Sequence, residues 1–157
     1  MKYLKSMLES KKGNKYLFLD IDGVFIPFVE NTNKRFFDDN EKWSKDAIEN
    51  LNILYKKFNP KVIIISSYCN EKTIKEFQEK FKEIGFVGKI SDKLKEQKSI
   101  KRFSQVKKLI NNNDTVIIID DREHDIKDFP ELKRSWCQPA PLKGFTKKDL
   151  EKCLEMI

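Results

Sequence analysis

The sequence predicts an α/β protein in which a parallel sheet of about five strands lies between two layers of helices. Three short apolar runs, rich in β-branched or aromatic residues, carry this prediction: YLFLD (16–20), KVIIISS (61–67) and TVIIIDD (115–121). Strands that are buried on both faces have such near-continuous apolar sequences. Segments with helical periodicity separate them, and this alternation is typical of a parallel sheet covered on both sides.

Three segments carry apolar residues at the spacing of one helical face. They are residues 44–58, which begin at a serine, residues 71–84, which are followed by Gly85, and residues 99–110, which begin at Ser99. Polar residues at the start and glycine beyond the end are the usual signals of helix boundaries. We therefore expect one helix between each pair of neighbouring strands.

Two weaker strands and a terminal helix complete the predicted fold. The strands are expected near residues 86–90 and 134–138. The helix TKKDLEKCLEM begins at Thr146, and Asp149 lies three positions further on, which makes an imperfect capping box.

Length, apolar content and cysteine count restrict the class of protein. The chain of 157 residues is the size of a single domain with a real core, which we place at 15–157 after a basic N-terminal segment at 1–14. No stretch approaches the roughly 20 apolar residues of a membrane span, and the first residues do not read as a signal peptide. The three cysteines show no CxxC spacing, so neither a disulfide framework nor a zinc site is predicted. We expect a cytoplasmic protein without a membrane partner, and the oligomeric state stays open.

The net charge of +7 suggests a polyanionic partner such as nucleic acid. Most of the basic residues are lysine, and the chain is also rich in Asn and Ile, a mixture that codon bias produces equally well. A basic stretch at 89–108 is more often a solvated helix face than a binding patch. Charge alone therefore leaves both interpretations open.

Polar or acidic residues follow all three strong strands, in the pairs Asp20 and Asp22, Ser66 and Ser67, and Asp120 and Asp121. An acidic turn completed by Gly23 would explain the first pair alone. Ligands of open α/β sheets, however, bind at the carboxyl ends of the strands, where all three pairs are expected to meet. Asp20 and Asp22 point to the same side and repel each other unless a cation or a proton lies between them.

These residues resemble the motifs of the haloacid dehalogenase (HAD) superfamily of phosphotransferases. DIDGV at 20–24 is similar to the first motif, DxDG[VT], and the apolar strand ending at Ser66 is similar to the second. Lys98 precedes the acidic strand as the third motif does, and IIIDDREHD at 117–125 resembles the fourth. The resemblance implies the three-layer, Rossmann-like HAD fold.

Within the superfamily, the chain resembles the small HAD domains of Swiss Army Knife RNA repair proteins. LDIDGV, SSYCN, IDD and GFTKKDLEKCLEMI correspond to their motifs over about residues 15–157. Tyr68 and Cys69 stand where an aromatic residue and an arginine follow the serines. The intervals 23–42 and 69–97 are too short for a cap domain of ordinary size, so we expect no large cap and an open site.

The resemblance implies a Mg²⁺-dependent phosphomonoester hydrolase. Asp20 is the implied nucleophile, which forms an aspartyl-phosphate, and Asp22 is the general acid and base. The implied metal ligands are Asp20, Asp121 and the backbone carbonyl of Asp22, with Asp120 or Asp125 beside them. Ser66 and Lys98 are implied to bind the phosphoryl oxygens, and Lys95 or Lys101 could replace Lys98 in this role. Gly23, Ser67 and Lys101 are expected to contact the substrate.

Three functions remain open on the sequence. The preferred one is hydrolysis of a terminal phosphate of a nucleic acid, because an open site suits a macromolecular end and residues 89–108 favour a polyanion. The alternatives are a phosphatase of small metabolites or nucleotides and a non-catalytic, nucleic-acid-binding HAD-like module. His124, the only histidine, is expected to be a solvated neighbour of Asp125, and Trp43 and Trp136 are expected to pack in the core.

Overall fold

A computed structural model describes residues 13–30 and 32–157. The predicted segment 1–14 lies outside this part of the chain except for its last two residues. The structure confirms an α/β fold with a five-stranded sheet in the order β3-β2-β1-β4-β5, in which every pairing is parallel. The strands are β1 (Lys15–Leu19), β2 (Lys61–Ile64), β3 (Ile90–Lys93), β4 (Thr115–Ile119) and β5 (Trp136–Cys137).

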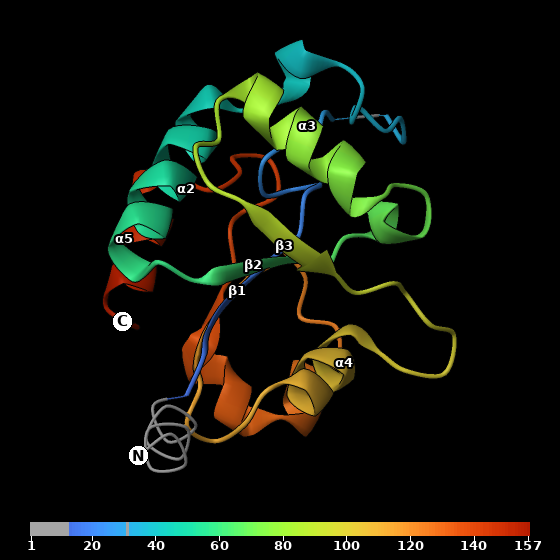
Figure 1. Cartoon of the computed structure of the whole chain (residues 1–157). Helices are drawn as coiled ribbons and strands as arrows, with labels where there is room; N and C mark the ends of the chain where they lie inside the picture. Colours follow the sequence, from blue (N-terminus) through green and yellow to red (C-terminus); the bar gives the residue numbers. More distant parts are fainter. Residues whose placement is uncertain (1–12, 31) are drawn as a thin grey trace.

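Helices cover both faces of the sheet. Figure 1 shows α2 (Lys45–Phe58), α3 (Ile74–Ile84) and α5 (Lys147–Leu154) on one face. The other face carries α4 (Arg102–Leu109) and the short helices η3 (Ile126–Asp128) and η4 (Pro130–Ser135). Two further 3₁₀ helices are η1 (Asn40–Lys42) and η2 (Ser67–Asn70). Within the described residues, no helix is both long and apolar enough to cross a bilayer.

Side chains of β1, β2 and β4 alternate between two hydrophobic cores. In β1, Leu17 and Leu19 pack in the core on the side of α2, whereas Phe18 packs in the core on the side of α4. Ile64 and Ile63 of β2 divide in the same way. Both faces of β1, β2 and β4 are buried up to their carboxyl ends, and the polar residues that follow these ends form the candidate site.

Several element boundaries differ from the expectations. The helix expected over 99–110 begins only at Arg102, because Gln97 and Ile100 form an antiparallel bridge that takes the preceding residues out of the helix. The helix expected over 71–84 begins at Ile74, where Thr73 forms a full capping box. Of the two weaker strands, β3 lies a few residues later than the expected 86–90, whereas β5 is a two-residue strand within the expected 134–138.

The segment after β1 forms a tight turn rather than a cap domain. The carbonyl of Ile21 accepts hydrogen bonds from the N–H groups of Val24, Phe25 and Ile26, at 3.1, 2.9 and 3.2 Å. Val24 in turn accepts a bond of 2.8 Å from the N–H of Phe145, which ties this turn to the loop before α5. The other interval, between β2 and β3, holds only η2 and α3. Neither described interval forms a folded insertion, so the carboxyl edge of the sheet stays uncovered by a cap.

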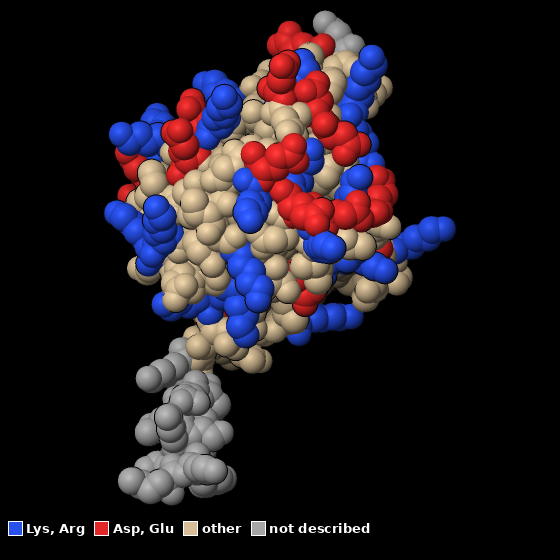
Figure 2. Space-filling model, turned by 45° about the horizontal axis from the view of Figure 1, so that its top comes forward, with Lys and Arg blue, Asp and Glu red and all other residues tan. Residues whose placement is uncertain are grey.

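Charged side chains of both signs are interspersed over the surface. Figure 2 shows Lys and Arg over the whole face in this view, with Asp and Glu between them mainly in its upper half. Several bases of the stretch 89–108 are engaged within the protein: Lys93 Nζ donates to the carbonyls of Cys69 and Lys72, and Lys107 pairs with Glu131 at 3.1 Å. These two lysines are therefore paired within the protein.

Candidate active site

Three buried aspartates meet at the carboxyl ends of β1 and β4. Asp20 follows β1, and Asp120 and Asp121 follow β4. The two strands pair in register up to Leu19 and Ile119, so the residues after them are neighbours. One carboxylate oxygen from each aspartate lies within 4.8 Å of the others. The structure thus brings together three of the five residues that were expected at a metal ion.

The electrostatics of this cluster favour a bound cation. Burial raises the pKa of Asp20 well above its usual range, the charge of Asp120 adds to the rise, and Arg102 opposes it. Burial also raises the pKa of Asp121. The Oδ1 atom of Asp121 is buried, and within the described residues it has no hydrogen-bond partner. A buried carboxylate oxygen without a partner is costly, and the oxygen-rich donor set suits Mg²⁺.

Asp22 lies at the edge of the cluster on the turn that follows β1. Its Oδ1 accepts a hydrogen bond of 3.0 Å from the Tyr68 hydroxyl, and the Arg35 guanidinium stacks 3.9 Å from the centre of the Tyr68 ring. Burial raises the pKa of Asp22, although the Tyr68 hydrogen bond and the Arg35 charge act in the opposite direction. A half-buried carboxyl group with a raised pKa is suited to proton transfer.

Gly23 makes room for the cluster. It has a φ of +78°, and a Cβ atom built on it would overlap the Asp121 carboxylate. Gly23 was expected to contact substrate, whereas the structure places it directly against Asp121. Glycine at this position allows both the left-handed backbone and the close approach.

Arg102 is a buried cation at the aspartate cluster, and sequence reasoning missed its role. Its Nη1 lies 2.8 Å from Asp120 Oδ2 and 3.5 Å from Asp20 Oδ2. Its Nη2 lies 3.2 Å from Glu96 Oε1. Burial alone would lower the pKa of Arg102, but the charges of Asp20 and Asp120 outweigh burial and raise it. The signal that could have found Arg102 is its place at the start of a predicted helix that precedes the acidic strand. The helix was expected from residue 99, whereas α4 begins at Arg102.

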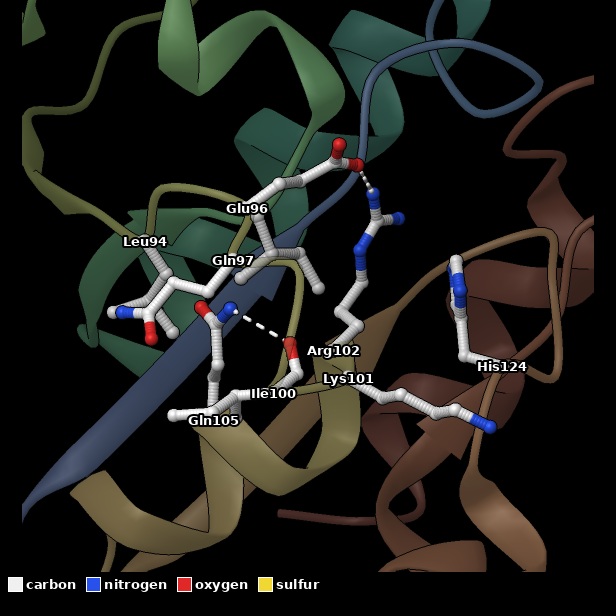
Figure 3. Close-up of a pocket in the computed structure, with 9 residues that line it drawn as sticks. Leu94, Glu96, Gln97, Ile100, Lys101, Arg102, Gln105 and His124 are labelled. Carbon is white, nitrogen blue, oxygen red and sulfur yellow. Dashed lines mark hydrogen bonds and ion pairs between the residues drawn. The ribbon is translucent and has the colours of Figure 1, made fainter.

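Lys98 and Lys101, the two lysines assigned to phosphoryl or substrate contacts, lie away from the aspartates. Lys98 is exposed in the turn between Gln97 and Ile100. Lys101 lines a neighbouring cavity of about 350 Å³. Figure 3 shows this cavity, in which the Lys101 side chain extends away from the Arg102 guanidinium. The structure does not bring either lysine to the aspartate cluster.

The two serines after β2 have different positions. Ser66 is fully buried, and its Oγ accepts a hydrogen bond of 3.2 Å from the Tyr68 N–H at the start of η2. Ser67 lines the cavity beside the aspartates, and its Oγ accepts a bond of 3.0 Å from Arg35 Nη2. Ser67 is therefore the serine whose side chain borders the open space.

Asp125 anchors α4. One of its oxygens accepts from the Phe103 N–H at 2.8 Å, and the other accepts from the N–H and the hydroxyl of Ser104, at 3.1 and 2.6 Å. Burial would raise the pKa of Asp125, but these hydrogen bonds outweigh it and lower the pKa. Both oxygens are thus occupied at the first turn of α4, so Asp125 acts on the site through the helix that carries Arg102.

His124 contacts the aspartate cluster rather than being only a neighbour of Asp125. Its Nε2 lies 3.3 Å from Asp120 Oδ2, and its φ is +40°. Asp120 therefore has two cationic or donor partners, Arg102 and His124, which lower its pKa against the effect of burial. Asp120 is more fully engaged within the protein than Asp121, which has an unpaired oxygen.

These side chains surround a cavity of about 90 Å³. This volume is far below the roughly 300–1,000 Å³ of pockets that hold whole drug-sized ligands, so it suits a small group such as a phosphoryl group. The lining residues are Asp20, Asp22, Phe28, Ser67, Glu96, Arg102, Asp121, Arg122 and His124.

A parallel five-stranded α/β sheet with clustered aspartates after its first and fourth strands defines a HAD-type domain, a class of hydrolases and phosphatases. The sequence matches the family described as HAD domain in Swiss Army Knife RNA repair proteins over residues 16–150, and the chain belongs to this family. Searches of curated proteins and of solved structures gave no match.

Proposed function

We propose that this protein is a Mg²⁺-dependent phosphomonoester hydrolase with Asp20 as its nucleophile. The observation that carries the proposal is the buried group of Asp20, Asp120 and Asp121, in which Asp121 Oδ1 has no partner among the described residues. A cation would satisfy that oxygen and neutralise a cluster that burial otherwise makes unfavourable.

Asp20, Asp121 and the backbone carbonyl of Asp22 are the groups that would hold the metal ion. Bound Mg²⁺ would neutralise charge on the phosphoryl oxygens, which otherwise repel an attacking carboxylate. Asp120 would not bind the metal ion directly, because its Oδ2 is already paired with Arg102 and His124. It would add negative charge next to the ligands.

The side chains have distinct roles in the proposed reaction. A carboxylate oxygen of Asp20 attacks phosphorus, the bond to the leaving oxygen breaks, and an aspartyl-phosphate forms. Asp22 gives its proton to the leaving oxygen, and then removes a proton from the water that hydrolyses the aspartyl-phosphate. Because Tyr68 occupies Oδ1 of Asp22, Oδ2 remains for this proton. Arg102 orients Asp20 and offers positive charge to the transferring oxygens.

The first experiment measures hydrolysis of an aryl phosphate with and without Mg²⁺ in wild type and Asp20→Asn. We expect metal-dependent turnover that is lost in Asp20→Asn. A matched control is Asp46→Asn, which changes an exposed aspartate in the first turn of α2 and should retain wild-type turnover. Equal turnover in wild type and Asp20→Asn would disprove the mechanism.

As substrate we propose a terminal phosphate of a nucleic acid. The uncapped carboxyl edge of the sheet and membership of a family named for RNA repair proteins support this choice. The competing proposal, a phosphatase of small metabolites or nucleotides, predicts equal kcat/KM for a mononucleotide and an oligonucleotide. A cytoplasmic location is part of the proposal and is supported by three free, buried cysteines.

A further inference from the structure

We infer that the cavity lined by residues 26–29 and 32–36, together with Asp22 and Arg122, is the leaving-group subsite, and that it receives the terminal nucleotide of a nucleic-acid strand. The inference rests on the proposed function, because it assumes that a phosphoryl group occupies the small cavity beside Asp20. Beyond the proposed function, the inference names the residues that select the substrate and the side of the site on which the substrate lies.

The position of Asp22 determines the side. A general acid must lie within hydrogen-bond reach of the leaving oxygen, so the rest of the leaving group extends past Asp22. Asp22 lines the small phosphoryl cavity and also a second cavity of about 270 Å³. Phe28 and Arg122 border both spaces as well, so the two cavities adjoin at these three side chains.

The other neighbouring cavity does not meet this requirement. It shares Glu96, Arg102 and His124 with the phosphoryl cavity, and Asp22 is not among its lining residues. Figure 3 shows Arg102 directed toward Glu96 at its border, where the two are joined by an ion pair of 3.2 Å. A leaving group in that cavity would be remote from the general acid.

The charge of the subsite suits a second phosphate. Three cations line it, Lys34, Arg35 and Arg122, against a single carboxylate, Asp22. Arg35 is held in place by Glu71 at 2.7 Å. Arg122 is exposed, and within the described part of the chain it has no carboxylate at ion-pair distance. A phosphodiester next to the terminal nucleotide would supply the missing anion.

The apolar wall of the subsite suits a nucleobase. Phe28 and Val29 are 39% and 41% exposed, although most large apolar side chains of the described residues are buried. An exposed aromatic ring beside cations is the usual arrangement for stacking a base next to a bound sugar–phosphate backbone. A phosphopeptide would offer the charge without the stacking partner, and this difference can be measured.

The test compares three phosphomonoesters with Mg²⁺ present: an aryl phosphate, a single-stranded trinucleotide with one terminal phosphate, and a phosphoserine peptide of matched negative charge. The trinucleotide is used in its 3′- and 5′-phosphorylated forms, as RNA and as DNA. The measured quantity is kcat/KM for each extended substrate divided by kcat/KM for the aryl phosphate. This ratio removes any loss of activity that is common to all substrates.

The variants are Arg122→Gln and Phe28→Ala, with Lys57→Gln as the matched control. Lys57 is exposed in the last turn of α2, which leads to the amino end of β2 and therefore lies at the opposite edge of the sheet. We expect the trinucleotide ratio to fall about tenfold in each of the first two variants and to stay unchanged in the control. The peptide ratio should fall in Arg122→Gln alone.

Other results overturn the inference in distinguishable ways. A trinucleotide ratio near one in wild type, or a ratio that Phe28→Ala leaves unchanged, refutes the leaving-group subsite. The proposed function is retained in either case if the aryl phosphate is hydrolysed. A peptide ratio above the trinucleotide ratio indicates that the substrate is a phosphoprotein and not a nucleic acid. Absence of aryl phosphate hydrolysis overturns the proposed function, and the leaving-group subsite with it.

Discussion

At the scale of single residues, the site depends on a few side chains whose partners are specific. Asp22 has one oxygen bound by Tyr68, Asp120 is bound by Arg102 and His124, and Asp121 keeps an oxygen without a partner among the described residues. These differences separate chemically identical carboxylates into different roles. The raised pKa of Asp22 fits a proton donor, and the unpaired oxygen of Asp121 fits a metal ligand.

The first prediction concerns Arg102. Arg102→Lys should lower kcat/KM for an aryl phosphate at least about tenfold, because a single ammonium group cannot contact Asp120 and Glu96 together as the guanidinium does. Steady-state kinetics measure this effect. Lys98→Gln should cost much less, since Lys98 lies exposed in a turn. A larger loss in Lys98→Gln than in Arg102→Lys would contradict the assignment.

The second prediction concerns Gly23. Gly23→Ala should weaken Mg²⁺ binding about tenfold, because the added Cβ displaces the Asp121 carboxylate, and calorimetric titration measures the affinity. Gly85→Ala is the matched control. Gly85 also has a positive φ, of +113°, but its Cβ would meet only Ile48 Cγ2 at 3.9 Å. The control should therefore lose stability without losing Mg²⁺ affinity, and equal Mg²⁺ affinity in all three proteins would refute the role of Gly23.

At the scale of elements, the start of α4 is the feature that organises the site. Lys101 is its N-cap residue and makes no side-chain capping bond. Asp125, from the loop after β4, instead accepts the bonds of the first turn. This contact connects the acidic loop to the helix whose first residue is Arg102, so the aspartates and their cation are positioned together.

The third prediction follows from this contact. Asp125→Asn should lower the free energy of unfolding at neutral pH by about 1–3 kcal/mol, the usual effect of removing a hydrogen-bonded buried charge. The folded-state pKa of Asp125 is lowered. Its contribution is therefore present above its unfolded pKa of about 3.9 and is lost as the pH falls through the folded value.

Urea unfolding from about pH 7 down through the acid range checks this prediction, because the stability difference between the two proteins should shrink as the pH falls below about 3.9. Asp128→Asn is the control, since Asp128 is exposed in η3. A stability difference between wild type and Asp125→Asn that does not change with pH would show that the carboxylate charge is not what stabilises α4.

At the scale of the whole molecule, the net charge of +7 is distributed rather than concentrated. Lys and Arg are spread over the whole face in Figure 2, with Asp and Glu between them mainly in its upper half, and parts of the basic stretch 89–108 are engaged with carbonyls or carboxylates. The cations that face the proposed substrate are instead a local group, Lys34, Arg35 and Arg122. Recognition of a strand end is therefore expected to be local.

The fourth prediction is a weak salt dependence of oligonucleotide binding. If two or three cations contact phosphates, the slope of log K against log salt for a single strand should be about −1.4 to −2.1. Fluorescence anisotropy at several salt concentrations measures the slope, and Arg122→Gln should reduce its magnitude by about 0.7. A slope far steeper than this would indicate binding over the whole basic surface.

The sequence by itself determined the sheet and the place of its acidic edge. The alternation of apolar strands and amphipathic helices is a local pattern in the sequence. Strands of a parallel sheet are buried on both faces, so they appear as the continuous apolar runs YLFL, VIII and VIII. Connections in such a fold then bring the residues after β1 and β4 to one edge, so Asp20 and Asp121 could be placed together in advance.

Only the tertiary structure decided which partners these residues have. The start of α4 depends on a bridge between Gln97 and Ile100 and on the carboxylate of Asp125, and this shift of three residues places Arg102 instead of Lys98 beside Asp20. The Tyr68 contact to Asp22 likewise joins two segments that are far apart in the chain. Local patterns record which face of an element is buried, whereas partners across the site are set by how separate elements pack against one another.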